Sequence, residues 1–67
     1  MQTMNKSISN ERLLTPEQLA QLLQVPKATL YKWRSENRGP KGIKIGKHVR
    51  YPFEGVHRWL ADMAGEL

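Results

Sequence analysis

Residues 14–33 read LTPEQLAQLLQVPKATLYKW, and they contain the signals for two successive helices. Thr15 is suited to cap a helix, Pro16 suits the first helical position, and Gln18 can complete a capping box onto Thr15. Leucines then recur at helical spacing and form an apolar stripe. We predict a first helix from Pro16 to about Leu23.

A second helix follows after a three-residue turn. Val25 precedes Pro26, and a residue before proline is pushed out of the helical region. A helix from Lys27 to about Glu36 would then carry two apolar side chains on one side, before glycine and proline at 39–40 stop it. Two short helices joined by such a turn indicate a helix-turn-helix.

Residues 43–45 and 49–51 alternate apolar and basic side chains, which is typical of half-buried strands. A two-residue turn at 46–47 would mix the two kinds of side chain on each face of the hairpin. A three-residue loop at 46–48 would make one face apolar and the other basic, so we favour it. This register would pair Ile45 with Val49, Ile43 with Tyr51, and Lys44 with Arg50.

The period becomes helical again after Pro52, and Gly65 is a plausible end for this last helix. The predicted fold class is mainly α with a small β-hairpin: a winged helix-turn-helix in the order helix, helix, hairpin, helix. The expected domain covers residues 13–65, after a flexible N-terminal leader at 1–12. The predicted core consists of Leu30, Trp33, Ile43, Ile45, Val49, Tyr51 and Trp59.

Charge is distributed unevenly along the chain, whose net charge is +5. Residues 27–50 contain eight cations and one anion, whereas residues 52–67 contain one cation and three anions. A basic centre of this kind indicates a polyanion partner, here double-stranded DNA. The sequence has no cysteine, no recognisable metal-ligand spacing and no long apolar run. We therefore expect a cytoplasmic DNA-binding protein that is no enzyme and has no metal, cofactor or membrane association.

The second helix of a helix-turn-helix enters the major groove, so its exposed face is the candidate reading surface. Leu30 and Trp33 define the buried side, and Arg34 is interpreted as a surface side chain on the core flank. The opposite side supplies the candidates for DNA contact on this recognition helix: Lys27, Ala28, Tyr31, Lys32 and Ser35.

The hairpin is the second candidate DNA-binding element. A thin basic ribbon can follow phosphates or place an arginine in a narrow minor groove. Arg50 is favoured for the groove, because guanidinium is less strongly hydrated than ammonium. The candidates on the wing and its flanks are Arg38, Lys41, Lys44, Lys47, His48 and Arg50.

Residues 14–25 and 28–33 resemble the helix-turn-helix of the excisionase family, the recombination directionality factors, which is related to the DNA-binding domain of MerR regulators. Residues 43–51 resemble the wing of that family, and 53–60 its closing helix. Gln24 stands where the family usually has glycine, and Pro26 where it often has serine. A residue other than glycine at positive φ is strained, so the turn is the position that departs most from the pattern.

The resemblance implies a phage or mobile-element protein that binds and bends attachment-site DNA and promotes excision by a tyrosine integrase. It also implies cooperative self-association on DNA. A small transcription regulator of the AlpA or MerR type is the alternative on the same fold. From another class, a protein-interaction module could dock a partner through the hairpin or the acidic last helix.

Overall fold

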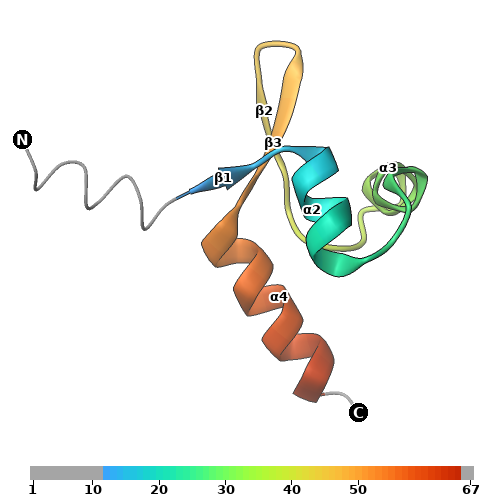
Figure 1. Ribbon diagram of the computed structural model, residues 1–67, viewed down its shortest axis with the longest axis vertical. Coiled ribbons are helices and arrows are strands. Elements are labelled where there is room, and N and C mark those ends of the chain that lie inside the picture. Colours follow the sequence, from blue (N-terminus) through green and yellow to red (C-terminus); the bar gives the residue numbers. More distant parts are fainter. Residues whose placement is uncertain (1–11, 66–67) are drawn as a thin grey trace, which may run out of the picture.

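The computed structural model describes residues 12–65. Three helices and a three-stranded antiparallel sheet of order β1-β3-β2 make up this part of the chain (Figure 1). The winged helix-turn-helix expected from the sequence is confirmed. The elements in chain order are β1 (Leu13–Leu14), α2 (Pro16–Leu23), α3 (Lys27–Ser35), β2 (Ile43–Ile45), β3 (His48–Pro52) and α4 (Phe53–Gly65).

The predicted capping box fixes the start of α2. The Gln18 backbone N–H donates to the Thr15 hydroxyl over 3.0 Å, and the Thr15 N–H donates to Oε1 of Gln18 over 2.9 Å. Two of the free N–H groups at the helix terminus are thereby satisfied within the chain. Both predicted ends of α2 are confirmed.

The turn between α2 and α3 depends on one unusual backbone conformation. Gln24 lies in the left-handed region at φ 59°, and the N–H of Val25 donates to the Ala20 carbonyl over 3.0 Å. Pro26 is extended and directly precedes α3. The turn therefore follows the geometry that glycine would adopt most easily, with glutamine in its place.

The hairpin has a different register from the one predicted. Ile45 pairs with His48, Lys44 with Val49, and Ile43 with Arg50, so the turn contains only Gly46 and Lys47. Gly46 has φ 64°, and a glycine at positive φ in the first turn position is what a tight two-residue hairpin turn of this kind requires. The prediction of a three-residue loop at 46–48 was wrong.

This register changes which hairpin side chains enter the core. Val49 and Tyr51 face inward, whereas Ile43 and Ile45 share the outer face with Arg50 and are 45% and 47% exposed. The prediction that both isoleucines join the core was wrong. Paired residues in an antiparallel ladder project from the same face, and Ile43 is paired with Arg50 and Ile45 with His48, so both isoleucines lie on the outer face.

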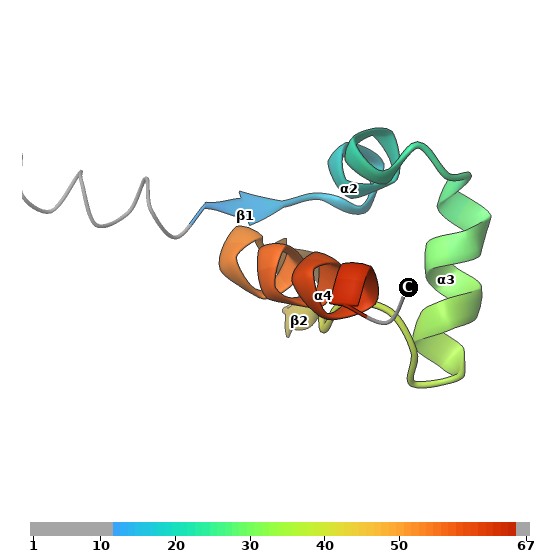
Figure 2. The same ribbon diagram turned by 90° about the horizontal axis from the view of Figure 1, so that it is seen from below.

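The core lies where α2, α3, β3 and α4 meet. Its buried hydrophobic side chains are Leu19, Leu30, Tyr51 and Val56. Trp33 packs against them, and its ring centroid lies 5.6 Å from that of Trp59, so the tryptophans join α3 to α4. Figures 1 and 2 both show α3 at the edge of the molecule opposite β1, with its outer side uncovered.

Strand β1 is an element that the sequence did not reveal. Leu13 pairs with Pro52 and Leu14 with Tyr51, and the Arg12 carbonyl accepts a 2.8 Å hydrogen bond from the Phe53 N–H. Arg12, which we assigned to the flexible leader, is thus tied to the domain. The rest of that leader, residues 1–11, lies outside the described residues.

Candidate nucleic-acid interface

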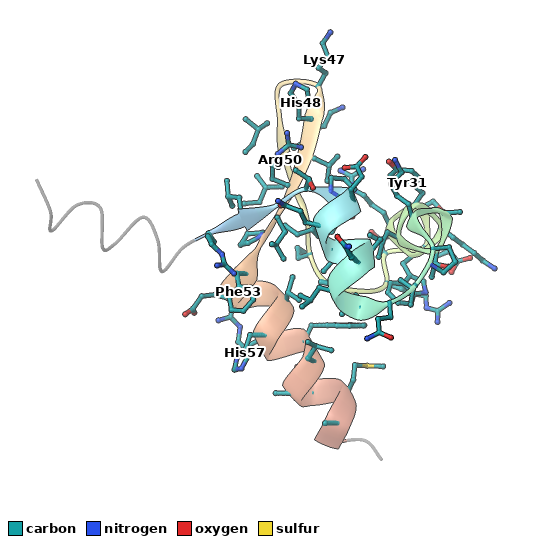
Figure 3. All side chains as sticks on the ribbon, viewed as in Figure 1. Tyr31, Lys47, His48, Arg50, Phe53 and His57 are labelled. Carbon is teal, nitrogen blue, oxygen red and sulfur yellow. The ribbon has the colours of Figure 1, made fainter. Side chains whose placement is uncertain are left out.

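The outer face of α3 carries all five candidates for DNA contact at exposed positions. Tyr31 is 50% exposed and lies on the upper edge of α3 in Figure 3. The Ser35 hydroxyl donates to the Lys32 carbonyl over 2.9 Å, which fixes it along the helix. Helix spacing thus placed the five side chains on an accessible face, while their contact with DNA stays a prediction.

Lys27 is exposed at the start of α3, but its ammonium group forms an ion pair with a carboxylate of α2. Its Nζ lies 2.8 Å from Oε2 of Glu17. The hydrogen bond from Lys27 lowers the pKa of Glu17, and the same bond raises the pKa of Lys27. Both groups are therefore charged near neutral pH, and the ion pair reduces the positive potential at this end of α3.

The wing extends away from the body of the molecule and ends at Lys47 and His48 (Figure 3). Lys44, Lys47 and His48 are exposed, whereas Arg50 is half-buried and donates from Nη1 to the Val49 carbonyl over 2.8 Å. Lys44 is paired with Val49, on the opposite face from Arg50. The expected single basic face is therefore wrong, because both faces of the wing carry cations.

Arg38 and Lys41 lie between α3 and the wing, as the flank predictions required. Both are exposed, and Nη1 of Arg38 lies 3.0 Å from Oε1 of Glu36. They line a surface pocket of about 490 Å³ together with Arg34. Arg34 was not among the residues predicted to contact DNA. Its position three residues after Tyr31, which places the two on neighbouring parts of one helix surface, is the signal that could have included it.

Residues 12–65 were predicted to contain no metal site and no membrane-spanning segment. This part of the chain contains no group of three or more histidine, aspartate or glutamate side chains arranged to hold a metal ion. Its helices also include none that is long and apolar enough to cross a membrane.

Comparison with known proteins places the chain in a family. The model of a family described as a helix-turn-helix domain matches residues 13–64, which cover all the helices and strands apart from the last residue of α4. No curated protein and no solved structure matches the chain. With an exposed second helix and a basic wing beside it, this protein belongs to the helix-turn-helix domain family and is a DNA-binding protein.

Proposed function

We propose that this protein binds a specific duplex sequence and acts as an excisionase-like recombination directionality factor. It would bend attachment-site DNA and favour excision by a tyrosine integrase, and it would do no chemistry itself. One observation carries the proposal: Tyr31 of α3 and the tip of the wing project toward the same side of the molecule (Figure 3). Two elements directed to one side can occupy adjacent grooves of one duplex.

The charges of α3 and of the wing support DNA as the partner. Lys32 is exposed on α3, and Lys44 and Lys47 are exposed on the wing, with no ion pair among the described residues. Cations of this kind neutralise phosphates and release counterions, which makes affinity fall steeply with salt. A module that bound only protein would bind DNA weakly, and that weak binding would not depend on salt in this way.

Selection from a random duplex library, followed by fluorescence anisotropy at several salt concentrations, tests specific binding. We expect a short motif to be enriched and the affinity to fall steeply as salt rises. Lys32→Ala should weaken binding, and Arg50→Ala should weaken binding to most sequences and flatten the salt dependence by about one unit. Arg58→Ala is the control, because Arg58 lies on α4 beside Glu54.

The recombination role needs its own readout. We expect the selected duplex, labelled at both ends, to shorten its end-to-end distance on binding, as measured by energy transfer. Tandem copies of the motif should be occupied cooperatively. Specific binding without bending, and without any effect on an integrase acting at that site, would support the small transcription regulator instead. No enrichment and weak binding at every salt concentration would contradict both roles.

A further inference from the structure

The segment from the end of α3 to the start of β2 forms most of a surface pocket, to which α3 adds Arg34. Its pocket of about 490 Å³ is predominantly polar and is lined by three exposed cations, Arg34, Arg38 and Lys41. Three positive side chains within one small concavity repel each other. An anion that bound among them would relieve this repulsion.

The end of α3 does not need these cations as caps. The N–H groups of Glu36 and Arg38 both donate to the Trp33 carbonyl, over 3.0 and 2.7 Å, and the Asn37 N–H donates to the Arg34 carbonyl over 3.2 Å. The carbonyls of Trp33 and Arg34 are therefore satisfied by the backbone, which turns through Asn37 at φ 59°. The cationic side chains remain available for another group.

One of the three cations is already engaged. Arg38 is paired with Glu36, whereas Arg34 and Lys41 have no ion pair within residues 12–65. The pocket thus keeps about two positive charges, which suits a singly charged oxyanion held by an arginine and a lysine. A guanidinium offers two parallel N–H donors to such a group.

The pocket also lies where the recognition helix meets the wing. Arg34 belongs to α3, and Gly42, at the other end of the pocket, directly precedes β2. A side chain at Gly42 would approach within 3.0 Å of the Tyr51 ring, so this end of the loop is packed against β3. Burial raises the pKa of Tyr51, and the positive charge of Arg34 opposes that increase.

A duplex that accepts α3 in its major groove and the wing in the next minor groove must pass one strand between them. We propose that the pocket of Arg34, Arg38 and Lys41 is the seat of one backbone phosphodiester of that strand, with Arg34 as its principal ligand. This inference rests on the proposed DNA binding. It assigns to Arg34 a role in setting the register of the protein along the duplex, since phosphate contacts fix register and base contacts specify sequence.

The test uses the selected duplex in versions that each carry one uncharged methylphosphonate, along the strand expected to pass the pocket. We expect Arg34→Ala to lower affinity for the natural duplex by about tenfold, in the range of a charge-assisted hydrogen bond, and to flatten the salt dependence by about one unit. One methylphosphonate position should cause at least a similar loss in the wild type and a clearly smaller additional loss in Arg34→Ala, where Lys41 remains. Arg34→Lys should retain part of the affinity, and Arg58→Ala all of it.

Free phosphate is the other source of the same anion, and a titration of the protein with inorganic phosphate distinguishes it. We expect the backbone amide resonances of residues 37–39, 41 and 42 to shift only weakly and without saturation below roughly 10 mM, because a single surface ion pair is weak. Saturable binding of inorganic phosphate, with unchanged DNA affinity in Arg34→Ala, would assign the pocket to a free anion and overturn the inference. Losses that add independently at every methylphosphonate position would also overturn it.

The outcomes distinguish a failure of the proposed phosphate site from a failure of the proposed DNA binding. Specific DNA binding that responds to Lys32→Ala and Arg50→Ala, but not to Arg34→Ala, would leave the proposed function intact and reject the phosphate seat. A wild-type protein that binds no duplex would reject the proposed function, and the backbone assignment with it. We expect the thermal midpoint of each variant to match that of the wild type, which would assign the changes in affinity to binding and not to the fold.

Discussion

At the scale of single residues, two backbone conformations determine how α3 is held. Gln24 at φ 59° ends α2 and opens the turn into α3, and Gly39 at φ 78° turns the chain after α3. The left-handed region is readily adopted by glycine and is unfavourable for most other residues. Position 39 therefore has the residue that suits its backbone conformation, glycine, whereas position 24 has glutamine.

Replacing Gln24 with glycine should stabilise the protein. The substitution removes the unfavourable contact of Cβ at positive φ, and part of this gain is offset by the greater freedom of glycine in the unfolded chain. We expect an increase of about 0.5–1 kcal/mol in the free energy of unfolding, measured by urea denaturation. Gln21→Gly, at an exposed position within α2, should instead lose about 1 kcal/mol. Equal losses in both variants would contradict the strain assigned to Gln24.

Replacing Gly39 with alanine should have the opposite effect. The new Cβ would lie 2.8 Å from Cε3 of Trp33, and the backbone would keep a positive φ. Either the tryptophan or the turn must shift, at a cost of about 1–3 kcal/mol, visible as a lower thermal midpoint. Gly55→Ala is the control, because a Cβ there meets nothing within 4 Å and lies in helix α4. That variant should be neutral or more stable, as alanine is the better helix former.

At the scale of elements, the sequence predicts helices better than strand pairing. The start of α2 follows from Thr15, Pro16 and Gln18, whose side chains act within one turn of the chain. The hairpin alternates in both candidate registers, so the alternation alone does not choose between them. The choice depends on the turn at Gly46 and on the limited space over the sheet, which admits Val49 and Tyr51 but neither isoleucine of β2.

Strand β1 was missed for a related reason. Two residues are too few to show a period, and the pairing of Leu13 and Leu14 with the end of β3 joins segments that lie far apart in the sequence. Short pairings of this kind form because the surrounding tertiary structure brings the backbones together. They are therefore invisible to patterns read along the chain.

The observed register can be tested with one matched pair of substitutions. Ile45→Thr places a hydroxyl on the open outer face of the wing, whereas Val56→Thr places the same group among fully buried side chains. We expect the first change to cost less than about 1 kcal/mol and the second about 1–3 kcal/mol, in urea denaturation. The register with an apolar inner face would predict a large cost for Ile45→Thr as well. A cost for that variant equal to the cost at Val56 would therefore contradict the observed pairing.

At the scale of the whole molecule, the candidate site follows from charge more than from any one motif. Sequence reasoning found the outer face of α3 and the wing, because both are defined by local spacing. It did not assign Arg34, because the pocket forms only when the α3–β2 segment folds against β3. It also could not show that Glu17 of α2 would meet Lys27 across the turn.

The number of cations without an ion pair among the described residues predicts how steeply DNA affinity falls with salt. Lys32, Arg34, Lys41, Lys44, Lys47 and Arg50 are the six that lie on α3, the wing and the segment between them. If all six contact phosphates, the logarithm of affinity should fall with the logarithm of salt with a slope of about −5. A slope near −2 would mean that most of them stay in solvent when DNA is bound.

The ion pair of Glu17 and Lys27 leads to the opposite expectation, a variant that binds DNA more tightly. Glu17→Gln removes a carboxylate beside the proposed interface and frees Lys27, whose ammonium now lies 2.8 Å from Glu17. The pKa of Glu17 is lowered by its bond to Lys27, so protonation relieves the pair only below the ordinary pKa of a glutamate, and the substitution is needed at neutral pH. We expect about a two- to fivefold gain in affinity at low salt and a salt slope steeper by up to one unit.

Glu54→Gln is the matched control for this prediction. Glu54 also lies in the first turn of a helix and beside a cation, Arg58, but it belongs to α4 and not to the helix-turn-helix. Both substitutions change the net charge by the same amount, so a general increase in positive potential would raise the two affinities equally. A gain confined to Glu17→Gln places Lys27 at the DNA. Equal gains would show that Lys27 contributes only through the overall field of the molecule, and a loss in Glu17→Gln would mean that the carboxylate is needed to orient Lys27 for binding.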